Sequence, residues 1–194
     1  MTVSAASKLF TIEEYLELEE RSLTKHEYDK GKIMEMAGGT VTHNQLSGKI
    51  ITQLNIAADA IEASFLVYTS DMKIWIESRE RFVYPDAVTV AQKPEFYNNR
   101  RDIITNPLLI VEVTSSSTET FDFHGKFHLY RTVPSFMEYL LVSQEMHHVI
   151  RQYREAPDLW RTTDYFDLEE MIPLQSMGGE ISMQGIYKGV DLSA

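Results

Sequence analysis

The chain has 194 residues, which is enough for one domain with a substantial core and too few for two domains of ordinary size. Its 18 lysine and arginine residues against 29 aspartate and glutamate residues give a net charge of −11, which argues against strong nonspecific binding to nucleic acid. The lack of cysteine excludes disulfides and thiolate zinc sites.

The sequence carries no signal for export or membrane insertion. Residues 1–10 have no apolar core of signal-peptide length, and no run approaches the roughly 18 apolar residues of a membrane span. We therefore expect a cytoplasmic protein that does not enter a membrane.

The first predicted elements are a short helix and a strand hairpin. Thr11 and Glu14 have the spacing of a capping box, and the helix that they open should end before Ser22. The segment HEYDKGKIMEM, residues 26–36, then predicts two strands that turn at residues 29–31.

A long amphipathic helix follows a glycine-containing break. Apolar residues recur at helical spacing from residue 42 or 43 to residue 63, with His43 at the start of this helix. Residues 65–68 and 72–76 predict one bent strand or two. Residues 95–104 have no apolar period and predict a loop.

Two acids lie within strand-like sequence. The segment RFVYPDAVTV, residues 81–90, alternates at strand period, and Pro85 before Asp86 indicates an edge, a bulge or the start of a strand. Glu112 interrupts an apolar run, where a carboxylate is costly unless it is paired, protonated or bound to a cation. Taken singly, Asp86 fits a turn cap and Glu112 a buried ion pair. Together they form an oxygen site of the kind that Mg²⁺ or Mn²⁺ uses.

The segment after Glu112 predicts a polar face on the next helix. Residues 114–120, TSSSTET, are a turn and helix-start signal. Asp122, Lys126 and Tyr130 then follow at i, i+4 and i+8, which places an acid, a base and a phenol on one helical face.

The C-terminal part of the sequence predicts three strands, followed by a segment whose secondary structure cannot be predicted. Residues 137–142, 148–153 and 160–165 predict a meander, whereas residues 167–194 give no clear pattern.

This order of elements predicts the fold class. It fits an α/β fold in which a central mixed sheet carries helices on both faces, with Asp86 and Glu112 on neighbouring central strands. We expect a single domain over residues 1–194, with its core at about residues 10–165.

Several stretches together resemble a known family. They are HEYDKGKIMEMAGGTVTHN, YTSDMKIWI, YPDAVTV, PLLIVEVTSSSTETFDFHGKFHLY and VPSFMEYLLVSQEMHHVIRQY. In these stretches the chain is similar to the Uma-type family of restriction-endonuclease-like proteins, within the PD-(D/E)XK nuclease superfamily. The resemblance implies a restriction-endonuclease-like core and a metal-dependent endonuclease that hydrolyses phosphodiester bonds of nucleic acid, with DNA as the expected substrate.

The resemblance also implies the catalytic residues. Asp86 and Glu112 match the two acids and would bind Mg²⁺ or Mn²⁺. Thr114 stands where the usual motif has lysine, and Lys126 matches a lysine that has moved to the following helix.

Other residues match positions near the site. Glu27 would assist metal binding or be an exposed strand acid, and His43 would orient substrate phosphate or be a capping or surface residue. Asp122 and Tyr130 share the helix face of Lys126 and would support it, although Tyr130 also fits a core position.

Two other classes of function fit the same residues. One is a degenerate nuclease-fold protein that acts as an oligomeric binding module. The other is a metal-dependent hydrolase of small anionic substrates, which suits the acidic charge better than DNA does. Cleavage of both strands of a duplex would favour a homodimer, since one site cuts one strand at a time.

Overall fold

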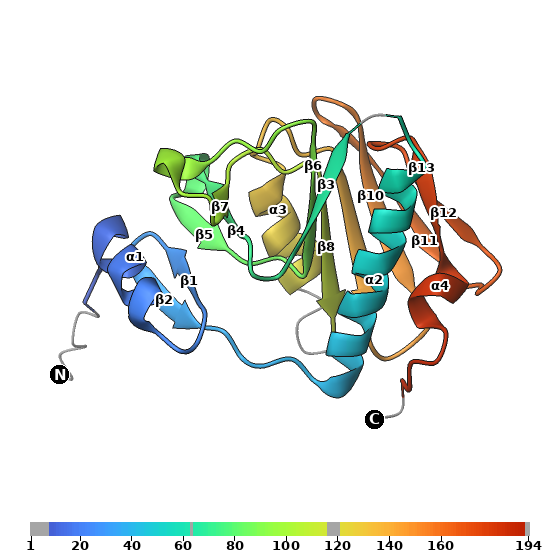
Figure 1. Cartoon of the computed structure of the whole chain (residues 1–194), viewed down its shortest axis with the longest axis horizontal. Coiled ribbons are helices and arrows are strands. Elements are labelled where there is room, and N and C mark those ends of the chain that lie inside the picture. The colour runs from blue at the N-terminus through green and yellow to red at the C-terminus, as the bar shows by residue number, and fades with distance from the viewer. Residues whose placement is uncertain (1–7, 63, 116–120, 193–194) are drawn as a thin grey trace, which may run out of the picture.

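The computed structural model describes residues 8–62, 64–115 and 121–192 (Figure 1). Within these residues, no helix is long and apolar enough to cross a membrane. The predicted helix-start signal lies for the most part outside the described residues, because they omit 116–120.

The N-terminal helix and hairpin form as predicted. Helix α1, Ile12–Arg21, begins with a capping box between Thr11 and Glu14 and ends at Arg21. Strands β1, His26–Asp29, and β2, Lys32–Glu35, pair antiparallel. The turn between them has positive φ at both Lys30 and Gly31, as a tight two-residue hairpin turn requires.

Most of the predicted strands lie in one mixed sheet. Among the described residues this sheet has six strands in the order β11-β10-β9-β8-β6-β3. Strands β8 and β9 run parallel, and the other neighbours run antiparallel. The predicted meander and the predicted mixed sheet are therefore confirmed. The bounds are β3 Phe65–Thr69, β6 Ala87–Ala91, β8 Leu109–Thr114, β9 Glu138–Ser143, β10 Val149–Ala156 and β11 Leu159–Tyr165.

The chain builds a second sheet beside this one, which the sequence did not predict. Its described strands are in the order β2-β1-β5-β4-β7. The chain leaves the six-stranded sheet after β3 and returns to it at β6, and Pro85 lies at the return. The added bounds are β4 Lys73–Ile76, β5 Arg81–Val83 and β7 Ile103–Ile104, with one-turn helices η1 Glu77–Arg79 and η2 Tyr97–Asn99.

Two predicted boundaries are wrong. The predicted loop at residues 95–104 contains the short strand β7, which pairs parallel with β4 and is fully buried. A strand of two residues is too short to show a period. Helix α2, Val41–Asp59, ends before the predicted residue 63, and Ile61, beyond its end, packs close to Gly179.

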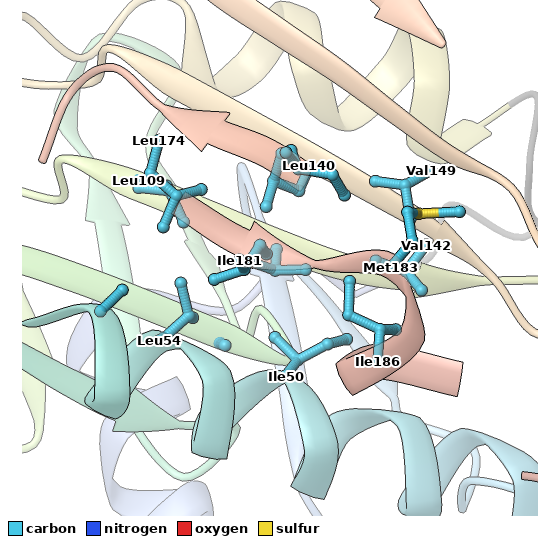
Figure 2. Packing of buried hydrophobic residues seen from close by; sticks show 14 of the residues in the cluster. Ile50, Leu54, Leu109, Leu140, Val142, Val149, Leu174, Ile181, Met183 and Ile186 are labelled. Atoms are coloured by element: carbon cyan, nitrogen blue, oxygen red, sulfur yellow. The ribbon is translucent and has the colours of Figure 1, made fainter. Parts of the chain in front are cut away.

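Helices cover both faces of the six-stranded sheet, as predicted (Figure 1). On one face α2 packs together with β12, Met171–Leu174, β13, Gly179–Ser182, and α4, Met183–Tyr187. Figure 2 shows side chains of α2, such as Ile50 and Leu54, meeting Ile181 and Ile186 and the strands. The unreadable C-terminal segment therefore completes the core.

The opposite face carries a π-helical segment, η3, Phe121–Lys126, that continues into α3, Phe127–Tyr130. Alternation along β8 decides which side chains meet it. Leu109, Val111 and Val113 pack on the α2 side, and Ile110 packs on the α3 side. Glu112 has the parity of Ile110, so it points toward α3.

Candidate active site

Asp86 and Glu112 face the same side of the six-stranded sheet from adjacent strands. Ala87, at the start of β6, pairs with Val111 of β8, so the register extended by one residue sets Asp86 across from Glu112. Residues across from one another in an antiparallel pair point to the same face. Glu112 lies on β8 as predicted, whereas Asp86 lies one residue before the neighbouring strand β6 rather than within it.

Both oxygens of Asp86 accept hydrogen bonds. The backbone N–H of Val113 donates to Oδ2 at 2.7 Å, and Nε2 of His43 lies 2.8 Å from Oδ1. The bond to Asp86 raises the pKa of His43, although burial opposes the shift. Helix α2 and strand β8 therefore hold this carboxylate from two sides.

Glu112 is almost fully buried, with 3% of its surface exposed. The hydroxyl of Tyr130 donates to Oε1 at 2.7 Å, and Nζ of Lys126 donates to Oε2 at 3.0 Å. Burial raises the pKa of Glu112 to about 8, against the opposing effect of the Lys126 ammonium. Glu112 is therefore buried and paired, which is one of the three alternatives that the sequence left open.

Lys126 bridges two carboxylates. Its Nζ lies 3.3 Å from Oδ1 of Asp122 as well as 3.0 Å from Glu112. Burial alone would lower the pKa of Lys126, but these two carboxylates more than offset it and raise the pKa above its ordinary value. Lys126 is therefore a fixed positive charge beside Glu112.

Thr114 has a different partner from the lysine of the usual motif. Its hydroxyl donates to Oδ2 of Asp122 at 2.9 Å and so links β8 to the start of η3. Asp122, Lys126 and Tyr130 come together as predicted, although the first six residues of their helix are π-helical. Single π turns of this kind are frequent at functional sites.

A pocket of about 560 Å³ lies between the two large sheets, and its lining includes Asp86, Glu112 and Lys126. Glu27 of β1 contributes to it, and the structure buries this residue rather than exposing it. The pocket is strongly acidic, with five carboxylates against one lysine among its described lining residues: Glu27, Glu35, Asp86, Glu112, Asp122 and Lys126. Among the described residues, no three histidine, aspartate or glutamate side chains converge closely enough to hold a metal ion by themselves.

Sequence reasoning missed one wall of the pocket. The glycine-containing break that the sequence predicts at residues 37–40 is a linker that lines the pocket beside His43. Thr40 caps α2 and donates from Oγ1 to Oε1 of Gln144 at 2.8 Å, which ties the linker to the end of β9. The sequence signal that could have indicated this wall is the Gly38-Gly39 pair directly before the helix cap Thr40. The contact with Gln144 could not be predicted, because it depends on the tertiary fold.

Comparison with known proteins adds three findings. A family model for Uma2, described as "Putative restriction endonuclease", matches residues 12–184. Two uncharacterised proteins from Synechocystis sp. are also similar to this chain. The first is 35% identical, over 84% of this chain and 92% of its own length. The second is 34% identical, over 92% of this chain and 91% of its own length. A crystal structure described as a "putative nuclease belonging to DUF820 from Anabaena variabilis" has a similar fold, with a TM-score of 0.72 at 14% identity over 92% of this chain and 97% of that one.

Proposed function

Because this chain belongs to the Uma2 family, described as "Putative restriction endonuclease", we propose that it is a metal-dependent endonuclease that cuts DNA. One observation carries the proposal. An acid before β6, an acid in β8 and a lysine from the next helix, Asp86, Glu112 and Lys126, line the same pocket. This arrangement supports the proposal, because two acids that can hold a metal ion and one positive charge suit phosphodiester hydrolysis.

The donor chemistry of the pocket fits Mg²⁺ or Mn²⁺. Asp86 and Glu112 offer hard carboxylate oxygens, and each of these oxygens has a lone pair beyond the hydrogen bond described above. Mg²⁺ keeps several waters and commonly takes only one or two protein carboxylates, so a site short of three such ligands suits it. A bound divalent ion would polarise the phosphodiester and lower the pKa of the attacking water.

The residues of the chain itself would perform the remaining tasks. The Lys126 ammonium, held by Glu112 and Asp122, would stabilise negative charge that develops on the phosphoryl oxygens. Tyr130 orients Glu112, and Asp122 orients Lys126. His43 and the Val113 amide orient Asp86. Glu27 lines the same pocket, where the Arg81 guanidinium 3.7 Å away offsets part of its negative charge.

The test is cleavage of supercoiled plasmid in Mg²⁺, in Mn²⁺ and in EDTA. We expect cutting by the wild type only with a divalent ion. Near-isosteric Asp86→Asn, Glu112→Gln and Lys126→Met should each reduce the rate at least about 100-fold, because the two acids would hold the metal ion and the lysine would stabilise developing charge.

Matched controls separate loss of chemistry from loss of fold. Asp158→Asn and Lys188→Met make the same chemical changes at exposed positions outside the pocket lining and should keep the wild-type rate. Thermal melts must show that the three site variants remain folded. Cleavage that survives in a folded Glu112→Gln protein, or that persists in EDTA, would refute the proposal.

Metal binding and cleavage of further substrates separate the other functional classes. Folded protein that binds Mn²⁺ yet cuts neither duplex nor single-stranded DNA would favour the binding module. Hydrolysis of small phosphodiesters without DNA cleavage would instead favour a hydrolase of small anionic substrates.

A further inference from the structure

The linker before α2 approaches His43 unusually closely. A Cβ atom added to Gly39 would lie 2.8 Å from Cδ2 of His43 and 3.2 Å from Cγ. Carbon atoms in contact prefer separations of about 3.5–4.0 Å, so the ring would have to move. The neighbouring Gly38 is different, because a Cβ added there meets nothing within 4 Å.

The imidazole of His43 has little freedom to retreat from this contact. Its Nε2 bonds to Asp86 at 2.8 Å, and its backbone N–H donates to the capping hydroxyl of Thr40 at 3.1 Å. The linker is fixed too, since Nδ2 of Asn44 donates to the carbonyl of Gly39 at 3.3 Å. The ring is therefore held between the backbone of Gly39 and the carboxylate of Asp86.

We propose that Gly39 is a positioning residue: its missing side chain lets the imidazole of His43 reach Asp86 and hold that carboxylate in its orientation. The consequence for metal binding and cleavage rests on the proposed function. The contact between Gly39 and His43 does not, so it can be tested separately.

The first measurement needs neither metal nor substrate. Imidazole ¹H–¹⁵N correlation spectra of His43 are recorded at one pH for wild type, Gly39→Ala and Gly38→Ala. We expect the His43 resonances to shift in Gly39→Ala, because the added methyl displaces the ring from Asp86, and to keep their wild-type positions in Gly38→Ala. Unshifted His43 resonances in Gly39→Ala would overturn the proposal.

The second measurement is a double-mutant cycle read as Mn²⁺ affinity. Groups that orient a metal ligand typically contribute 10–100-fold to affinity, so Gly39→Ala should weaken Mn²⁺ binding by about 10-fold or more. In a His43→Ala background, where the clashing ring is gone, Gly39→Ala should add less than about twofold. This double variant also guards against misfolding, since it has space for the new methyl.

The outcomes distinguish this inference from the proposed function. Equal loss of Mn²⁺ affinity in both backgrounds would overturn the positioning role, because Gly39 would then act without His43. The predicted resonance shift and coupling in a protein that binds Mn²⁺ but cuts no DNA would support the positioning role and refute the nuclease.

Discussion

At the scale of single residues, two hydrogen-bond donors, Lys126 and Tyr130, stabilise the buried acid Glu112. Glu112 could be identified from the sequence because a lone carboxylate in an apolar strand needs such partners. Lys126 and Tyr130 could be identified because their spacing puts them on one helical face. The bond from Thr114 to Asp122 could not, because it depends on where a π-helical turn begins.

We predict that the hydroxyl of Tyr130 stabilises the protein more than that of Tyr139. Tyr130→Phe leaves a buried oxygen of Glu112 without its 2.7 Å donor, which should cost about 1–3 kcal/mol. Tyr139→Phe removes a longer bond, 3.2 Å, to the backbone carbonyl of Asp122, and should cost about 0.5–1.5 kcal/mol. Both rings are fully buried, so packing changes little between the two variants. Urea denaturation at neutral pH measures the difference, and a reversed order would contradict the prediction.

At the scale of elements, the sequence predicted the helices and strands that have a clear period or a recognisable end. The capping box, the hairpin turn and the apolar run of β8 are local signals, so α1, β1, β2 and β8 form where expected. The division of the strands between two sheets could not be predicted, because it depends on which strands pair with one another, and no local sequence pattern specifies that. For the same reason residues 171–187 were unreadable, since their apolar positions make sense only against α2.

A polar network fixes helix α1 and strand β4 beside the pocket. Lys73 is nearly buried, and its Nζ lies 3.0 Å from Oδ2 of Asp102 and 3.1 Å from the hydroxyl of Tyr84. Tyr84 in turn donates to Glu19 of α1 at 2.6 Å. Burial alone would raise the pKa of Asp102, but Arg100 and Lys73 more than offset it and lower the pKa below its ordinary 3.8.

We therefore predict a pH-dependent contribution from Asp102. Because its folded pKa is lowered, its stabilisation is present above the unfolded value of 3.8 and is lost as the pH falls through the folded pKa. Asp102→Asn should cost on the order of 1 kcal/mol at pH 7, reduced by screening at this half-exposed group, and nearly nothing once the pH is well below 3.8. Asp71→Asn is the control, because Asp71 pairs with Lys25 at 2.6 Å with its side chain 83% exposed and should contribute little. Denaturation at several pH values tests this, and a pH-independent loss in Asp102→Asn would contradict it.

At the scale of the whole molecule, two properties affect how the site would meet DNA: the net charge of the chain and the number of sites in each chain. A net charge of −11 and an acidic pocket leave little attraction for a phosphate backbone before cations bind. Within the described residues, the chain holds one set of Asp86, Glu112 and Lys126. Under the proposed function, each chain should cut one DNA strand at a time.

We predict that nicked circles accumulate before linear plasmid. Linear product should rise with protein concentration, because two chains must act near one another to cut both strands. A gel time course at several concentrations, with light scattering to measure oligomeric state, tests this. Linear DNA at the earliest times from a protein that remains monomeric would contradict it.

The packing of α4 and the β12–β13 hairpin against α2 sets an order of events during synthesis. Helix α2 leaves the ribosome early, but part of the apolar cover for residues such as Ile50 is supplied by residues 171–187, which are translated much later. Contacts between segments so far apart in the chain form slowly, because a long loop must first be closed. A nascent chain that has not yet released residue 187 therefore lacks part of the apolar cover of α2, the helix that carries His43.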